Sequence, residues 1–254
     1  MRARDPLNRR RRVRRGKRRP APRATQRIRR GAHRTVPTRT QVISLRRALA
    51  KPHLRLVAID DGRFERTDRR ARIAAVVLSL PQRVEAVALG SVEVDGADAT
   101  EGIIALVEST GHIADLRAVL LDGPVVGGFN VVDLDALHRR LGLPIVAVTR
   151  RAPDQARIRS AIAKWFPLDA PERLRRLGAH RLFPVPTGAE PLRASVVGAG
   201  RPEAIQLLVR CRVQGFWPEP LRLAHLIASA APAPPGRTMR LRRKGPLTRS
   251  GPVA

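Results

Sequence analysis

Aspartates follow several short apolar runs of the chain, at the positions where strands would end. They are Asp60, Asp61, Asp95, Asp98 and Asp122. If the runs before Asp60 and Asp122 form neighbouring strands, these two carboxylates come within reach of one shared ligand, with Asp98 at a helix start nearby. Carboxylates so placed repel one another unless a hard divalent cation lies between them, and oxygen ligands select Mg²⁺ or Mn²⁺. Carboxylates that hold such an ion against phosphate oxygens can hydrolyse phosphodiesters.

The same aspartates have a second interpretation, because Asp-Gly is a common pair in tight turns. Asp61, Asp95 and Asp122 each precede a glycine, and Asp98 stands where a helix N-cap would. From the pattern alone, turns and a cap are favoured over a metal site. His225 is alone on an apolar helical stretch, which favours a buried, hydrogen-bonded histidine over a ligand.

The apolar runs predict the elements that must position these side chains. Strands are expected at 54–59, 73–80, 87–94, 118–121 and 144–148, and helices from Asp98 onward and over 131–141. Short spacings favour an antiparallel meander of the first three strands, and the later strands should be parallel, joined by right-handed crossovers. The predicted fold class is α/β, a mixed sheet with flanking helices, in which ligands sit beyond the carboxyl ends of the parallel strands.

Positive charge is concentrated at the two ends of the chain. The protein has 254 residues and a formal net charge of +29, from 50 Lys+Arg against 21 Asp+Glu. Residues 1–50 hold 19 basic side chains and one acid, and residues 237–254 hold six and none, which leaves 25 basic and 20 acidic residues between them. The start of the chain either grips nucleic acid by neutralising phosphates or is a poorly constrained extension.

Three segments follow from this composition. We expect a disordered basic arm over 1–50, one domain over 51–230, and a Pro-rich linker with a basic tail over 231–254. Within the arm, residues 42–49 could form a short helix against the core.

The composition also bears on the compartment. A single cysteine, Cys211, excludes an intrachain disulfide and a cysteine-based zinc site, so a reducing compartment is expected. The apolar run 74–80 is far shorter than the roughly 20 residues of a membrane span, and no apolar segment follows the basic start as in a secretory signal. We therefore expect a cytoplasmic, nucleoid-associated protein with no membrane partner.

Several uncommon strings, taken in order, resemble the endonuclease dU family. They are His53-Leu-Arg-Leu-Val-Ala-Ile-Asp-Asp-Gly-Arg-Phe64, Val94-Asp-Gly-Ala-Asp-Ala-Thr100, Leu121-Asp-Gly123 with Gly128-Phe-Asn-Val-Val-Asp133, Gly142-Leu-Pro-Ile-Val146, Arg151-Ala-Pro-Asp154 and 218–228. That family is similar to endonuclease V, with its ribonuclease H-like fold, and the resemblance makes 51–230 an endonuclease V-like domain. The chain departs from the family at Arg63, where proline is usual, which should alter the turn and leave the carboxylates intact.

The resemblance implies roles for the candidate acids. Asp60 and Asp122 correspond to the catalytic, metal-binding aspartates of the first and fourth strands. Asp98, or with less support Asp95, stands in the place of the carboxylate that opens the following helix. Asp61 is an alternative carboxylate, although strand alternation directs it to the opposite face from Asp60.

The resemblance also implies a substrate and a cofactor. Arg150 or Arg151 stands where such enzymes carry a basic residue near the scissile phosphate. The cofactor would be Mg²⁺ or Mn²⁺, and the activity would be nicking of DNA that contains a deaminated base, uracil in particular, in DNA repair. A flipped-out base would be read in a pocket.

Other functions and details stay open at this point. The alternative is a nucleic-acid-binding protein of the same fold without nuclease activity, and a small-molecule phosphoryl-transfer enzyme is more remote. Convergence of the carboxylates favours the nuclease. DNA or RNA and the lesion preference are open, a monomer is expected, and the chain has no tyrosine. The base-contacting aromatic is therefore one of Phe64, Phe129, Trp165, Phe166, Phe183, Phe216 and Trp217.

Overall fold

The structure of the protein is a computed structural model that describes residues 44–65, 67–81, 83–188 and 192–231. Most of the basic arm expected over 1–50, and nearly all of the tail expected over 231–254, lie outside the described residues. The short helix expected within 42–49 is present as α1 (Leu45–Leu49), which buries Leu45, Ala48 and Leu49.

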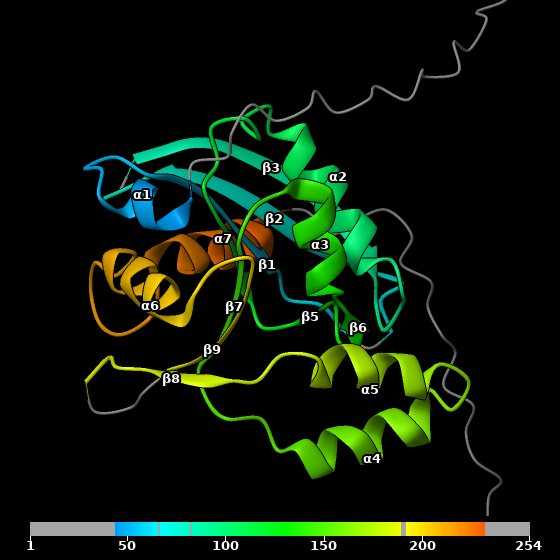
Figure 1. Cartoon of the computed structure of the whole chain (residues 1–254). Helices are drawn as coiled ribbons and strands as arrows, with labels where there is room; N and C mark the ends of the chain where they lie inside the picture. Colours follow the sequence, from blue (N-terminus) through cyan, green and yellow to red (C-terminus); the bar gives the residue numbers. More distant parts are fainter. Residues whose placement is uncertain (1–43, 66, 82, 189–191, 232–254) are drawn as a thin grey trace, which may run out of the picture. The chain divides into compact units, whose positions relative to one another are not determined.

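A seven-stranded mixed sheet in the order β3-β2-β1-β4-β7-β9-β8 organises the described residues (Figure 1). The meander consists of β1 (Arg55–Asp61), β2 (Arg70–Ser79) and β3 (Arg83–Glu93). On the other side of β1 lie β4 (Val119–Asp122) and β7 (Ile145–Thr149), both parallel to it. The expected mixed sheet and its five strands are confirmed, and the order from β3 to β7 is ribonuclease H-like.

Two further strands that were not predicted extend the sheet beyond β7. They are β9 (Leu192–Val197), antiparallel to β7, and β8 (Phe183–Val185), antiparallel to β9. A separate two-stranded hairpin of β5 (Val125–Val126) and β6 (Asn130–Val131) follows β4.

Helices cover both faces of the sheet, because its central strands bury side chains on both. The helices are α1, α6 (Arg201–Arg210) and α7 (Glu219–Ala230) on one face, and α2 (Ala99–Ser109) and α3 (Leu134–Leu141) on the other. Along β1, Leu56 and Ala58 belong to the core under α7, whereas Val57 and Ile59 belong to the core under α2 and α3. This alternation directs Asp60 to the α7 face and Asp61 to the opposite one.

Local signals set the limits of α3. Its N-cap, Asp133, accepts a hydrogen bond from the N–H of Ala136 at 2.8 Å. The helix ends at Gly142, whose φ of 59° is the left-handed conformation that glycine adopts without strain. The helix expected over 131–141 therefore begins three residues later than predicted, at Leu134, and ends at Leu141 as predicted.

A helical pair follows β7 and was not predicted. It consists of α4 (Gln155–Trp165) and α5 (Ala170–Gly178), and α4 packs on α5. Across the ranges described above, none of the helices has the length and apolar character that crossing a bilayer requires.

Candidate active site

Asp60 and Asp122 lie side by side at the carboxyl ends of two neighbouring parallel strands. The β1–β4 register pairs Ile59 with Leu121, so the next residue along each strand is Asp60 and Asp122. Both side chains continue the sheet face that α7 covers, because they alternate in step with Ala58 and Leu120. The structure thus brings together the two aspartates that sequence reasoning placed at adjacent strand ends.

The Asp60 carboxyl group is buried and incompletely satisfied. The residue is 5% exposed, and its Oδ1 accepts the N–H of Asp61 at 2.7 Å. Its Oδ2 makes no hydrogen bond with any described residue. Buried carboxylate oxygens are normally hydrogen-bonded, so a buried oxygen without a hydrogen bond beside a second carboxylate calls for a positively charged ligand.

Burial and mutual repulsion shift the titration of this pair. Burial raises the pKa of Asp60 to about 9, and repulsion from Asp122 and then from Asp61 acts in the same direction. Burial also raises the pKa of Asp122, although the positive charge of Arg150 opposes the rise. Two carboxyls in this position share one proton near neutral pH and titrate as a unit.

His225, on α7, lies beside Asp60. Its Nδ1 lies 3.2 Å from Asp60 Oδ2 and 3.2 Å from the carbonyl oxygen of Asp61, and only the second contact has hydrogen-bond geometry. Because a carbonyl oxygen can only accept, the proton of the neutral ring resides on Nδ1. The expected hydrogen bond of a buried histidine is present, but the expectation of burial is wrong, since the side chain is 43% exposed.

A close backbone approach brings α7 to the end of β1. A Cβ on Gly62 would lie 2.4 Å from the carbonyl oxygen of Ala228, so only glycine lets the two backbones come this near. The contact sets the position of His225 relative to Asp60. The helix presents Leu221, Ala224 and Ala228 to the core, and His225 flanks that buried stripe.

Asp61 has a different environment on the other face of the sheet. Its Oδ2 accepts the N–H of Gly127 at 2.6 Å, which ties the end of β1 to the loop between β5 and β6. Burial raises the pKa of Asp61, and the hydrogen bond from Gly127 opposes the rise. The predicted opposite orientation of Asp60 and Asp61 agrees with these contacts.

Asp98 begins α2, but its carboxylate is engaged outside that helix. It accepts the N–H of Glu93 at 2.9 Å and the Nδ2 of Asn130 at 2.7 Å, and its other oxygen lies 3.5 Å from the Arg70 guanidinium. The N–H of Ala99 is capped instead by Oδ1 of Asn130, at 3.0 Å. Asp98 therefore holds the β3–α2 connection to Asn130.

Asp95 serves the same connection as a turn residue. Its φ of 58° is left-handed, and its Oδ1 accepts the N–H of Phe129 at 2.8 Å. Within the described ranges no three His, Cys, Asp or Glu side chains are grouped as a metal site would need. Asp60, Asp98 and Asp122 are thus not gathered into one ligand set, and the role of Asp98 in metal binding stays a prediction.

Arg150, and not Arg151, faces the paired carboxyls. The Arg150 guanidinium lies 4.3 Å from the centre of the Trp217 ring, and its charge acts on Asp122. Both arginines are exposed, and the carbonyl oxygen of Arg151 accepts the hydroxyl of Thr149 at 3.0 Å. Sequence reasoning left the two arginines equal and gave Trp217 no role beside either of them.

The Asp60–Asp122 pair suits a divalent cation by the chemistry of its donors. Both are hard oxygen ligands, and Mg²⁺ is commonly held by one or two carboxylates together with substrate phosphates and water. A bound cation would also offset the repulsion between the two groups. The donor set therefore fits Mg²⁺ or Mn²⁺.

A buried carboxyl beside a half-buried one at the carboxyl ends of parallel strands, in a ribonuclease H-like sheet, is an arrangement that can hold a divalent cation against phosphate oxygens. Residues 52–232 match the family model described as endonuclease dU. The chain belongs to the endonuclease dU family, and this membership supports a nuclease that acts on nucleic acids.

The chain is also similar to known archaeal proteins over most of their length. A UPF0215 protein of Thermococcus gammatolerans is 40% identical over 187 residues, which cover 71% of this chain and 93% of the relative. A UPF0215 protein of Methanothermobacter thermautotrophicus is 35% identical over 188 residues, with 70% and 88% covered. The crystal structure of a protein of unknown function from Archaeoglobus fulgidus has a TM-score of 0.63 and 29% identity, and covers 70% of this chain and 97% of that chain.

Proposed function

We propose that the protein is a divalent-cation-dependent endonuclease that nicks DNA containing deaminated bases, with uracil as the main lesion. The observation that carries the proposal is the buried Asp60 Oδ2, which lacks a hydrogen bond within the described structure and stands beside Asp122. Membership of the endonuclease dU family supports the reaction class, and the excess of basic residues supports a polyanionic substrate. The protein would act in the cytoplasm as a monomer.

Each side chain of the site has a distinct part in this proposal. Asp60 and Asp122 would hold Mg²⁺ or Mn²⁺, which when bound supplies an activated water and neutralises charge on the phosphate. The Nδ1–H of His225 donates to the Asp61 carbonyl, which orients the ring and leaves Nε2 available as a proton acceptor. Arg150, stacked on Trp217, adds positive charge where the phosphate would lie.

The test uses labelled oligonucleotides that contain uracil, hypoxanthine or no lesion, incubated with purified protein in Mg²⁺, Mn²⁺ or EDTA. We expect a nick in the uracil strand that needs the cation, a weaker one in the hypoxanthine strand, and none in the undamaged strand. Intact strands in every cation condition, together with tight binding, would instead identify a nucleic-acid-binding protein of the same fold.

Two matched variants separate the site from its surroundings. Asp60→Asn should abolish nicking, because the amide is a poor ligand for a hard cation. Asp61→Asn, one residue away on the other face, keeps an oxygen acceptor for Gly127 and should retain most of the activity. Equal rates for Asp60→Asn and the wild type would remove the metal site from the proposal.

A further inference from the structure

One segment carries the excess positive charge of the central part of the chain. Residues 150–182 hold nine Lys+Arg and three Asp+Glu, whereas the rest of 51–236 holds sixteen and seventeen. The segment begins at Arg150, directly after β7, and includes α4 and α5. A net charge of this size on one segment marks a surface that attracts a polyanion.

Within this segment α4 is weakly attached to the core. Ile162 is its one fully buried residue, and its packing partner is α5. In Figure 1, α4 lies on the side of α5 away from the central sheet. The charged side chains of α4 are therefore available to a partner.

The connection between α4 and α5 exposes large apolar side chains. Trp165 is 62% exposed and Leu168 is 98% exposed. Phe166, between them, turns inward, with its ring 5.7 Å from that of Phe129 and the Arg173 guanidinium 4.3 Å above it. Phe166 thus packs the connection against the protein, whereas the Trp165 side chain faces solvent. The Lys164 ammonium lies 5.0 Å from the centre of the Trp165 ring.

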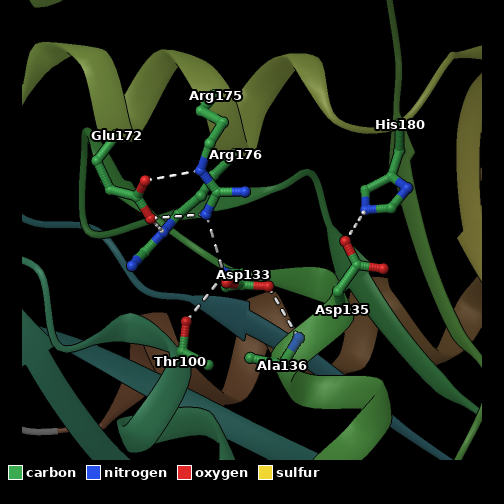
Figure 2. Close-up of polar contacts among 8 residues, drawn as sticks. All are labelled: Thr100, Asp133, Asp135, Ala136, Glu172, Arg175, Arg176 and His180. Atoms are coloured by element: carbon green, nitrogen blue, oxygen red, sulfur yellow. Dashed lines mark hydrogen bonds and ion pairs between the residues drawn. The ribbon is translucent and has the colours of Figure 1, made fainter.

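By contrast, α5 is fixed to the core by polar contacts, several of which Figure 2 shows. Glu172 binds Arg175 and Arg176 on its own helix, and Arg175 reaches to 4.0 Å from Asp133, the N-cap of α3. His180, just after α5, contacts Asp135 of α3 at 3.1 Å.

The inner side of α5 is held as well. Arg173 donates to the carbonyl oxygens of Phe129 and Asp95 and pairs with Asp169. The acids of the segment are thus largely used by α5, while Arg151, Arg159 and Lys164 form no ion pair with a described residue.

We propose that the α4–α5 hairpin, called the hairpin arm below to distinguish it from the basic arm of residues 1–50, holds an unpaired nucleic-acid strand next to the Asp60–Asp122 pair. Arg159 and Lys164 would neutralise phosphates, and Trp165 would stack on a base. The hairpin arm leaves the sheet at the carboxyl end of β7, beside Asp122, whose register partner on β7 is Val148. The hairpin arm would thus contact the substrate of the proposed nuclease. That the cleaved bond lies at the Asp60–Asp122 pair rests on the proposed function.

An unpaired strand is the occupant that matches both features of the hairpin arm. Exposed aromatic side chains bind bases through their flat faces, which a duplex hides and a single strand presents. Basic side chains bind the phosphates without regard to sequence. An acidic protein segment would match the charge of the hairpin arm and leave the indole of Trp165 without a stacking partner.

The first experiment measures binding in EDTA, so that cleavage does not contribute. The dissociation constant of a fluorescent single-stranded oligonucleotide is measured from 50 to 200 mM salt for the full chain and its variants. The double variant Arg159→Ala with Lys164→Ala should bind more weakly, and its log–log salt slope should be shallower by about 1.4, or about 0.7 for each lost phosphate contact.

The matched control removes the same charge at the other end of the parallel strands. Arg139→Ala with Arg140→Ala changes two exposed arginines in the last turn of α3, which precedes the amino end of β7. This control should keep the wild-type slope. Equal slopes for the hairpin-arm variant and the wild type, or equal losses in the hairpin-arm and control variants, would overturn the inference.

The second experiment tests stacking. The chain has two tryptophans and no tyrosine, so Trp217→Phe leaves Trp165 as the dominant emitter. Its fluorescence should be quenched when the single strand binds. Trp165→Ala should weaken binding about tenfold without changing the salt slope, and Trp165→Phe should restore most of the affinity.

Absence of quenching, or wild-type affinity in Trp165→Ala, would overturn the stacking contact. These outcomes are separable from the proposed function. If the protein binds the single strand as described and never nicks, the proposed nuclease activity is refuted and the strand-binding role of the hairpin arm stands. If the protein nicks and the hairpin-arm variants bind normally, only the role of the hairpin arm is refuted.

Discussion

Two clusters of aspartates at the ends of strands differ in how their carboxylates are satisfied. At the ends of β1 and β4, Asp60 and Asp122 repel each other, and Asp60 Oδ2 has no hydrogen bond to a described residue. At the end of β3, Asp98 accepts three hydrogen bonds, from the N–H of Glu93, the Asn130 amide and the Arg70 guanidinium. The first cluster costs stability when both of its carboxyls are ionised, and the second one contributes to stability.

This difference suggests that the Asp60–Asp122 pair is a ligand-binding site and that the contacts of Asp98 stabilise the fold. Repulsion between two ionised carboxylates this close has no benefit for folding, so the pairing of buried Asp60 with half-buried Asp122 favours a site for a positively charged ligand. The carboxylate of Asp98 accepts hydrogen bonds from Glu93 N–H and from the amide of Asn130, which is buried and needs a protein acceptor. Substitutions in the two clusters should therefore have opposite effects on activity and on stability.

The largest expected effect is on nicking. Asp60→Asn and Asp122→Asn should each lower the single-turnover rate by about 10³-fold or more, because the cation supplies several kcal/mol of stabilisation at about 1.36 kcal/mol per tenfold. The melting temperature of the metal-free variants should equal or exceed that of the wild type, because the repulsion is gone. Loss of both rate and folded structure would mean that the pair stabilises the fold instead.

Cation binding should be visible in stability without any substrate. A ligand at 100 times its dissociation constant stabilises the native state by about 2.7 kcal/mol. Mn²⁺ should therefore raise the melting temperature by roughly 5–10 °C for a domain of this size. Scanning calorimetry with Mn²⁺ and with EDTA measures the shift, which should vanish in Asp60→Asn with Asp122→Asn. The shift should persist in Asp98→Ala if Asp98 is no ligand.

A smaller effect is expected at the second cluster. Asp98→Ala should lower the free energy of unfolding by about 1–3 kcal/mol, because Glu93 N–H and the Asn130 amide lose their acceptor. Asp98→Asn keeps one acceptor oxygen and should lose less, as urea unfolding can show. If Asp98→Ala instead keeps wild-type stability and loses cation-dependent nicking, Asp98 is the third ligand that the family resemblance implies.

The parts of this comparison that the sequence could predict are local. Runs of buried residues located β1 and β4, and their alternation placed Asp60 and Asp61 on opposite faces, because side-chain direction along a strand has a fixed period. Short connections then predicted the meander, and the helices between the later strands predicted that those strands are parallel. These features need only neighbouring residues, so they are readable from the chain.

The remaining features depend on partners that are distant along the chain. Asn130 reaches Asp98 across 32 residues, and its amide, not the carboxylate of Asp98, caps α2. His225 reaches the end of β1 across 164 residues because Gly62 admits α7. Stacking on Trp217 distinguishes Arg150 from Arg151, and no local pattern encodes it.

The smallest expected effect is a dependence of stability on pH in the metal-free protein. The pKa of Asp60 is about 9 in the folded protein, against its ordinary value of 3.8. Between these values the folded state keeps a proton that the unfolded chain releases, so the stabilisation present below about pH 4 is lost as the pH rises toward 9. For one group the loss is at most about 1.4 kcal/mol per pH unit, and sharing of the proton with Asp122 reduces it.

Urea unfolding in EDTA between pH 5 and pH 9 measures this loss against Asp60→Asn, which has no proton to release at that position. The wild type should lose stability relative to the variant as the pH rises, and parallel curves would mean that Asp60 is ionised without a cation. Saturating Mn²⁺ should abolish the difference in slope, because the cation takes the place of the shared proton. A wild-type slope that persists in Mn²⁺ would locate the titrating group outside the pair, for example at Asp61, whose pKa burial also raises.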